Sequence, residues 1–201
     1  MPINYVSLTK LPTIHKGMSQ KYKVREANLP YFITVTVIDW VDIFTRAIYR
    51  DILDRSLNYC IKEKGLCVHA YVYMSNHIHL IVSSNDKQLE DIIRDFKKYT
   101  SKEIVKAIKE YPESRREWLL NKFSFAANRV KKGRRYKVWQ DGFHPIVMDT
   151  YEKIEQRVSY IHYNPVDANL VYHERDWVHS SFAAYEEGNR EHPNVKVSPL
   201  W

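Results

Sequence analysis

Two histidines separated by one apolar residue form the first candidate site in this chain. His77-Ile78-His79 directly follows the turn-forming pair Ser75-Asn76, in an apolar stretch with the length of a β-strand. Residues i and i+2 of a strand point to the same face, so both imidazoles should project side by side. Two neighbouring imidazoles can share one metal ion as ligands. By itself, however, so short a motif more often marks two half-exposed histidines on an open sheet face.

A second candidate site lies on a predicted helix that begins at Tyr151. Tyr160 and Asn164 are four residues apart, which places them one turn apart on one helix face. Both lie about 100° or more from the centre of the apolar stripe of this helix, so Tyr160 is not an obvious core residue and could face a cleft. His162 lies nearer the stripe and should pack, whereas Tyr163 points away from it and is a second candidate nucleophile.

The two candidate sites are chemically complementary. A tyrosine hydroxyl is a weak nucleophile near neutral pH because its ordinary pKa is about 10, and it needs a positioned base or an ion that stabilises charge. A divalent ion held by His77, His79 and Asn164 would leave open positions for phosphate oxygens and would orient a phosphate for in-line attack. Mg²⁺ or Mn²⁺ suits such a site, although Zn²⁺ also binds imidazole pairs.

The pattern of apolar residues predicts the elements that must position these side chains. The expected order is a strand at residues 32–38, a helix at 43–62, strands at 66–74 and 77–83, a helix at 89–108, a short strand within 139–147 and a helix at 151–164. This order indicates an α+β fold, a ferredoxin-like or RRM-like antiparallel sheet with helices packed on one face. The candidate tyrosine would lie on a C-terminal helix that Pro165 ends or kinks.

The 201 residues are expected to form one main domain. Residues 1–29 are predicted to be an N-terminal extension, residues 30–184 the catalytic domain and residues 185–201 a C-terminal tail. Within the domain, residues 109–137 are interpreted as a basic insertion or a mobile loop. No apolar run approaches the roughly 20 residues of a membrane span, and the N-terminus lacks the apolar core of a signal peptide. We therefore expect a cytoplasmic, nucleoid-associated protein with no membrane partner.

The distribution of charge favours a nucleic-acid partner. The net charge is +7, and residues 91–137 hold 15 basic against 6 acidic residues, whereas the remainder of the chain holds 16 against 18. A basic sector on a near-neutral body can neutralise phosphates, and aromatic residues interleaved with its charges can stack on unpaired bases. A solvated basic helix face is the simpler alternative. The residues expected to contact DNA are Lys97, Lys98, Lys102, Arg129, Lys131, Lys132, Arg134, Arg135 and Lys137.

Two segments together resemble a known family of DNA-processing proteins. Residues 69–82, HAYVYMSNHIHLIV, look like the signature hairpin of the single-strand transposases that use one tyrosine and a His-hydrophobe-His motif. Residues 159–166, SYIHYNPV, resemble the tyrosine helix of the branch called REP-associated tyrosine transposases. The order and the separation of the two motifs agree with that family, and the similarity extends loosely over residues 30–182.

The resemblance implies roles for individual residues. His77, His79 and Asn164 would ligate Mg²⁺ or Mn²⁺, and Tyr160 would be the nucleophile. The reaction would cleave single-stranded DNA next to a hairpin and leave a 5′-phosphotyrosine and a free 3′-hydroxyl, with no need for ATP. Family members include monomers and dimers, and we expect a monomer. The chain departs from the family at Ser75, where proline is usual, and in the length of residues 109–137, whose DNA contacts cannot be transferred.

Three other interpretations share some of these features. The chain could be a non-catalytic binder of single-stranded nucleic acid on a ferredoxin-like sheet. It could also be a zinc hydrolase, which would need a third histidine or a carboxylate as ligand. A rolling-circle initiator or relaxase would share the chemistry but usually orders its motifs differently. The pairing of the two motifs favours the transposase over all three.

Overall fold

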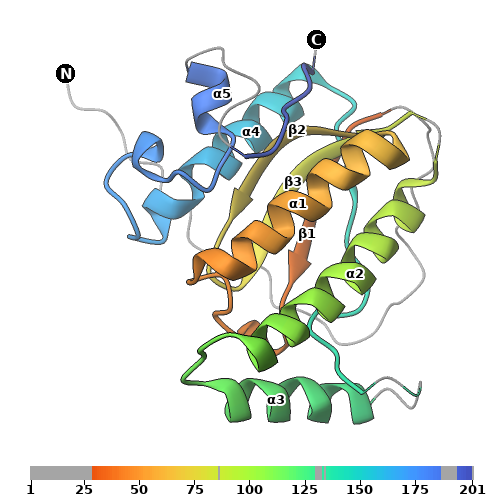
Figure 1. Cartoon of the computed structure of the whole chain (residues 1–201). Coiled ribbons are helices and arrows are strands. Elements are labelled where there is room, and N and C mark those ends of the chain that lie inside the picture. The colour runs from red at the N-terminus through yellow and green to blue at the C-terminus, as the bar shows by residue number, and fades with distance from the viewer. Residues whose placement is uncertain (1–28, 86, 130–132, 134, 187–193, 201) are drawn as a thin grey trace.

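The sheet has four antiparallel strands in the order β2-β3-β1-β4 (Figure 1). The computed structural model describes residues 29–85, 87–129, 133, 135–186 and 194–200. The strands are β1 (Tyr31–Thr36), β2 (Leu66–Tyr73), β3 (His77–Ser84) and the short β4 (Ile146–Val147). The three long strands match their predicted positions to within about two residues, because alternation of apolar side chains is a local signal.

The register between β1 and β3 determines what surrounds the histidines. Thr36 pairs with His77 and Thr34 pairs with His79. Directly paired residues of antiparallel strands point to the same face, so these two threonines and the next residue on that face, Phe32, flank the imidazoles.

The two faces of the sheet are covered by different helices (Figure 1). Helices α1 (Ala47–Lys64) and α2 (Leu89–Glu110) lie together on one face and enclose the larger core. Helix α4 (Tyr151–Asp167) lies across the opposite face, where it encloses a smaller apolar cluster. The predicted α+β architecture is confirmed, with two helices sharing one face. The histidines point toward the other face, on which the C-terminal helix lies.

Helix α4 begins at Tyr151, as predicted, but ends later than predicted. Thr150 caps the first turn, since its hydroxyl accepts a hydrogen bond of 3.3 Å from the backbone N–H of Lys153. Tyr151, the first residue of the helix, is 56% exposed and does not pack against the sheet. The helix does not end at residue 164 but continues through Pro165 to Asp167. A proline within the last turn removes only one backbone hydrogen bond, and the carbonyl of Pro165 still accepts from Leu170 N at 2.9 Å.

The segment predicted as an insertion or mobile loop contains helix α3 (Arg116–Asn128). The side chain of Glu113, only 2% exposed, anchors the start of this helix to the start of α1. It accepts hydrogen bonds from the hydroxyl of Tyr49 at 2.8 Å, from Arg46 Nη1 at 3.1 Å and from the backbone N–H of Arg115 at 3.1 Å. Burial alone would raise the pKa of Glu113, but these donors lower it to about 2. The ionised carboxylate of Glu113 therefore holds the start of α3 against the start of α1.

The end of the chain packs on the open edge of β2. Val195 and Val197 are buried, and the backbone N–H of Ser198 donates to Val68 O at 2.7 Å. Residues 194–200 therefore belong to the packed domain, although the sequence indicated a tail from residue 185. Two further elements, η2 (Glu174–Asp176) and α5 (Phe182–Glu186), precede this segment, and η1 (Ile38–Trp40) follows β1. Residues 1–28 of the predicted extension (1–29), and residues 187–193 and 201 of the predicted tail, lie outside the described residues.

Candidate active site

The two histidines of the motif lie side by side on β3, as predicted. Their Nε2 atoms are 3.1 Å apart, and the centroids of their rings are 4.7 Å apart. His79 is only 6% exposed, whereas His77 is half-buried. The pair is therefore not a pair of half-exposed surface histidines, because one ring lies almost entirely inside the protein and both converge on one point.

A hydrogen bond to Nδ1 orients each imidazole ring. His77 Nδ1 lies 2.7 Å from Asn76 Oδ1, and His79 Nδ1 lies 2.8 Å from the hydroxyl of Thr34. The carboxylate of Asp42 accepts from Asn76 Nδ2 at 2.9 Å, which fixes which end of the Asn76 carboxamide faces His77. With a proton on each Nδ1, both Nε2 lone pairs face the shared point. This is the arrangement by which outer-shell groups orient metal-binding histidines.

Burial keeps both imidazoles neutral at neutral pH. It lowers the pKa of His77 to about 4. Burial also lowers the pKa of His79 to about 3, with smaller contributions from His77 and from Arg157. Neutral imidazole is the form that ligates metal ions, so the pair needs no deprotonation to bind one near pH 7.

The donor set fits a divalent cation. Neighbouring ligands about 2.1 Å from an octahedral ion lie about 3.0 Å apart, and those of tetrahedral zinc about 3.3 Å apart, so the observed 3.1 Å separation suits both geometries. Among the described residues, no third histidine, cysteine, aspartate or glutamate joins the pair. The described part of the chain therefore lacks the additional ligand that the zinc-hydrolase interpretation requires.

Tyr160 lies directly against this pair. Its ring centroid is 5.3 Å from that of His79 and 5.9 Å from that of Phe32. Tyr160 is nevertheless 42% exposed, so its side chain lies at the edge of the site, open to solvent. The other candidate nucleophile, Tyr163, is 51% exposed. Among the described residues, its ring contacts neither His77 nor His79.

Asn164 lies one turn beyond Tyr160 on α4 and keeps its helical backbone, although a proline follows it. Its side chain is half-buried and forms no hydrogen bond with any described residue. The carboxamide is thus available as an oxygen ligand. His162 is buried, as predicted, and its Nε2 lies 2.9 Å from the hydroxyl of Ser181, so it belongs to the packing of α4.

Arg157 is a site residue that the sequence prediction missed. Its guanidinium carbon lies 4.9 Å from the ring centroid of Phe32 and 5.7 Å from that of Tyr160. Arg157 and Tyr160 are three residues apart and so lie on one helix face. This spacing could have identified Arg157 from the sequence. A guanidinium at this place can stabilise negative charge on a phosphate or on the phenolic oxygen.

A strained turn brings a tryptophan to the site. Asp39 and Trp40 both adopt left-handed backbone angles, with φ of 52° and 53°, and such angles cost roughly 1–2 kcal/mol per non-glycine residue. The turn holds the Trp40 ring 5.4 Å from the ring of His77, edge to face, while leaving 53% of Trp40 exposed. No sequence pattern signals positive φ at an Asp-Trp pair, so this residue was not predicted.

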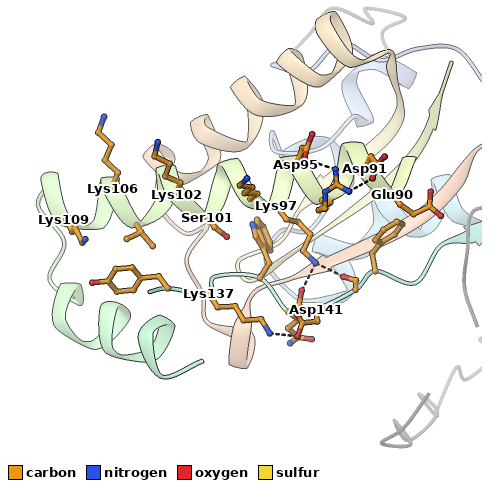
Figure 2. A pocket seen from close by; sticks show the side chains of 18 of the residues that line it. Glu90, Asp91, Asp95, Lys97, Ser101, Lys102, Lys106, Lys109, Lys137 and Asp141 are labelled. Carbon is orange, nitrogen blue, oxygen red and sulfur yellow. Dashed lines mark hydrogen bonds and ion pairs between the residues drawn. The ribbon is translucent and has the colours of Figure 1, made fainter. Parts of the chain in front are cut away.

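A groove of about 1080 Å³ follows α2 and is closed on its other side by residues 136–143 (Figure 2). Glu90, Asp91 and Asp95 line one end, where Arg94 forms ion pairs with both aspartates. Toward the other end a row of lysines follows one side of α2, and Lys137 lies across the groove from it. This row consists of Lys98, Lys102, Lys106 and Lys109.

The structure distinguishes among the predicted DNA-contacting residues. Lys98 and Lys102 are exposed along the groove. Lys97 instead donates to the carbonyls of Gln140 at 2.6 Å and Gly142 at 2.7 Å, and burial lowers its pKa to about 8, so it fixes the far wall of the groove (Figure 2). Lys137 has a side chain only 10% exposed and pairs with Asp141 at 2.6 Å.

Of the remaining predicted contacts, the structure describes Arg129 and Arg135. Arg129 and Arg135 are exposed and stack on Phe125 and Tyr136, at 4.4 and 5.6 Å. Lys131, Lys132 and Arg134 lie outside the described residues. Lys106 and Lys109 line the groove without having been predicted, although their spacing from Lys102 continues the same helix face.

The sequence matches the family model described as "Transposase IS200 like" over residues 26–164, which is more than half of the chain. The chain belongs to the IS200-like transposase family. A search of curated protein sequences returned no match.

A solved structure confirms the fold. The REP-associated tyrosine transposase bound to a REP hairpin superimposes with a TM-score of 0.60 at 17% identity, covering 92% of this chain and 94% of that one. A proposed transposase from Deinococcus radiodurans R1 gives a TM-score of 0.41 at 15% identity, covering 74% of this chain and 95% of that one. Transposases of this type generally use a divalent metal ion.

Replacing Asn76 with alanine should weaken Mn²⁺ binding about 10- to 100-fold, which is the usual effect of removing an outer-shell partner of a ligating histidine. The variant loses the acceptor that orients Nδ1 of His77. Mn²⁺ titration followed by electron paramagnetic resonance measures the free ion directly and does not depend on activity. Asn85→Ala, at the opposite end of β3, is the control and should leave the affinity unchanged. An unchanged affinity in Asn76→Ala would show that this hydrogen bond does not orient a ligand.

Proposed function

We propose that this chain is a metal-dependent endonuclease and strand transferase that cleaves single-stranded DNA next to a hairpin. The observation that carries the proposal is the contact between Tyr160 and His79, which joins the candidate nucleophile to the histidine pair within one chain. Membership of the transposase family supports the reaction class. The REP hairpin bound to the similar solved structure supports hairpin-bearing DNA as the substrate.

The chemistry follows from the residues in the site. The hydroxyl of Tyr160 would release its proton to solvent as its oxygen forms a bond to phosphorus. The bond from phosphorus to the 3′ oxygen would break, and the leaving oxygen would take up a proton from solvent. The products would be a 5′-phosphotyrosine and a free 3′-hydroxyl, and attack by another 3′-hydroxyl would reverse the reaction and join strands. Arg157 would stabilise the charge that develops beside the Tyr160 ring.

His77, His79 and the carboxamide oxygen of Asn164 would hold Mg²⁺ or Mn²⁺. When bound, the ion would polarise the scissile phosphate as a Lewis acid. The Asn76 carboxamide oxygen would keep His77 in the ligating tautomer, Thr34 orients the ring of His79, and burial keeps both imidazoles neutral. Because Tyr160 contacts His79 of its own chain, we propose that the tyrosine acts in its own subunit and that a monomer is sufficient.

The polarity of the covalent product tests this function. The protein is incubated with Mn²⁺ and a DNA hairpin that has single-stranded arms and a label at either end. We expect the 3′-labelled fragment to stay attached to the protein in denaturing gels and the 5′-labelled fragment to be released with an extendable 3′-hydroxyl. Attachment of the opposite fragment, or DNA binding without cleavage in both Mg²⁺ and Mn²⁺, would contradict the proposal, and the second result would favour a non-catalytic binder.

We further propose that the lysine row of α2 contacts the phosphates of the bound DNA. The variant Lys102→Gln/Lys106→Gln should bind the hairpin more weakly, and the slope of log K against log salt should become less steep by about 0.9 for each phosphate that the variant no longer neutralises. Fluorescence anisotropy at several salt concentrations measures both effects. Lys62→Gln, which removes an exposed charge from α1, is the control. An unchanged slope in the double variant would place the DNA elsewhere.

A further inference from the structure

A small pocket of about 270 Å³ adjoins the His77 side of the active site. It lies between η1 and the first half of α3. Its lining combines two tryptophans with charged side chains of both signs. These residues are Asp39, Trp40, Val41, Asp42, Arg115, Trp118 and Lys122.

The aromatic walls of this pocket are open to solvent. Trp40 is 53% and Trp118 is 48% exposed, and Lys122 Nζ lies 6.0 Å from the centroid of the Trp118 ring. Exposed aromatic faces of this kind stack on unpaired bases of single strands with little preference for sequence. Such stacking needs a flat partner, and an unpaired nucleobase is one.

The pocket is held in place by contacts between η1 and α3. Arg115 Nη1 donates to the carbonyl of Asp42 at 2.8 Å, and Lys122 forms an ion pair with Asp39 at 3.3 Å. Asp39 and Asp42 balance the charges of Arg115 and Lys122, so the pocket has no net positive charge to attract a phosphate. The carboxylate oxygens can instead accept hydrogen bonds from base amino groups. The charges therefore favour a base over the DNA backbone as the occupant.

Two contacts connect the pocket to the histidine pair. The Trp40 ring lies 5.4 Å from the ring of His77, and Asp42 accepts from Asn76, which in turn binds His77. Because the Trp40 ring contacts the ring of His77, a base stacked on Trp40 would lie close along the strand to a phosphate held at the histidines.

We propose that this pocket binds one unpaired base of the substrate strand, adjacent to the scissile phosphate, between Trp40 and Trp118. The inference rests on the proposed function for the position of that phosphate. It assigns to the strained Asp39-Trp40 turn the role of presenting one wall of a base-binding pocket beside the reacting centre.

Binding of a fluorescein-labelled DNA hairpin with single-stranded arms tests the pocket in a Tyr160→Phe background. Trp118→Ala should weaken binding about 5- to 150-fold, the effect expected for one stacked base, and Trp118→Phe should restore most of the affinity. Tyr172→Ala, which removes an aromatic ring that is 91% exposed elsewhere in the chain, should bind like the parent. Thermal melting verifies that each variant is folded.

An abasic substitution moved along each arm locates the base. One position should weaken binding to the parent but cause no further weakening with Trp118→Ala, because both changes remove the same interaction. The fluorescence of 2-aminopurine at that position should be quenched when the DNA binds the parent protein. This measurement needs no tryptophan variant. Effects that add at every position, or 2-aminopurine fluorescence that is unchanged throughout both arms, would overturn the pocket assignment.

These readouts need no cleavage, so the two proposals fail separately. If Trp118 couples to one arm position but the wild-type protein never cleaves DNA, the base pocket is supported and the proposed cleavage reaction is wrong. Normal cleavage without such coupling would remove the pocket alone.

Discussion

Tyr160→Phe should abolish DNA cleavage and the covalent protein–DNA adduct together, lowering the cleavage rate by at least about 10³-fold. The substitution removes one oxygen and leaves the ring, so the contacts with His79 and Phe32 should persist. Mn²⁺ affinity, hairpin binding and the melting temperature should therefore remain close to those of the wild-type protein. Cleavage of a labelled hairpin followed in denaturing gels measures the rate and the adduct in one experiment.

Tyr163→Phe is the matched control for this prediction. It makes the same chemical change three residues further along α4, on a side chain that makes no ring contact with the histidines among the described residues. It should cleave at the wild-type rate. If the adduct instead survives in Tyr160→Phe and disappears in Tyr163→Phe, the nucleophile has been assigned to the wrong tyrosine.

His77→Ala should lower Mn²⁺ affinity by at least about 100-fold and reduce cleavage to the level observed with a chelator. The half-buried position of His77 makes this variant more suitable than His79→Ala, which would open a cavity beside Phe32 and Tyr160. Isothermal titration with Mn²⁺ gives the affinity without reference to activity. Chelation of the wild-type protein should stop cleavage, and added Mn²⁺ should restore it.

An exposed histidine provides the control for this second prediction. His173→Ala removes an imidazole from the start of η2, outside the site, and should leave both Mn²⁺ affinity and cleavage unchanged. Wild-type Mn²⁺ affinity in His77→Ala would show that the ion binds elsewhere. Wild-type cleavage in the presence of a chelator would show that the reaction needs no ion at all.

The parts of the site that were predictable depend on local periodicity. The alternation of β3 determines that His77 and His79 share a face, and the helical repeat of α4 places Tyr160 one turn before Asn164. The structure adds that the two elements face each other, which no local pattern could establish. It was the joint resemblance of the two motifs to one family that led us to expect this convergence.

The features that were missed depend on contacts between distant segments. Helix α3 was read as a loop because its helical signal is weak, and it is held by the buried carboxylate of Glu113 between α1 and α3. Lys97 was counted as a free positive charge, but two carbonyls more than 40 residues away occupy its ammonium group. Trp139, which follows the basic sector in the sequence, is buried and donates to Thr100 at 2.9 Å, so it is not available to stack on a base.

The location of a bound ion tests the central claim most directly. In a crystal soaked with Mn²⁺, anomalous scattering should show one ion bonded to Nε2 of both His77 and His79, with the Asn164 carboxamide as a further ligand and the hydroxyl of Tyr160 facing the same space. An ion bound away from both imidazoles, or a Tyr160 hydroxyl directed away from the occupied site, would contradict the shared active site on which the proposed reaction depends.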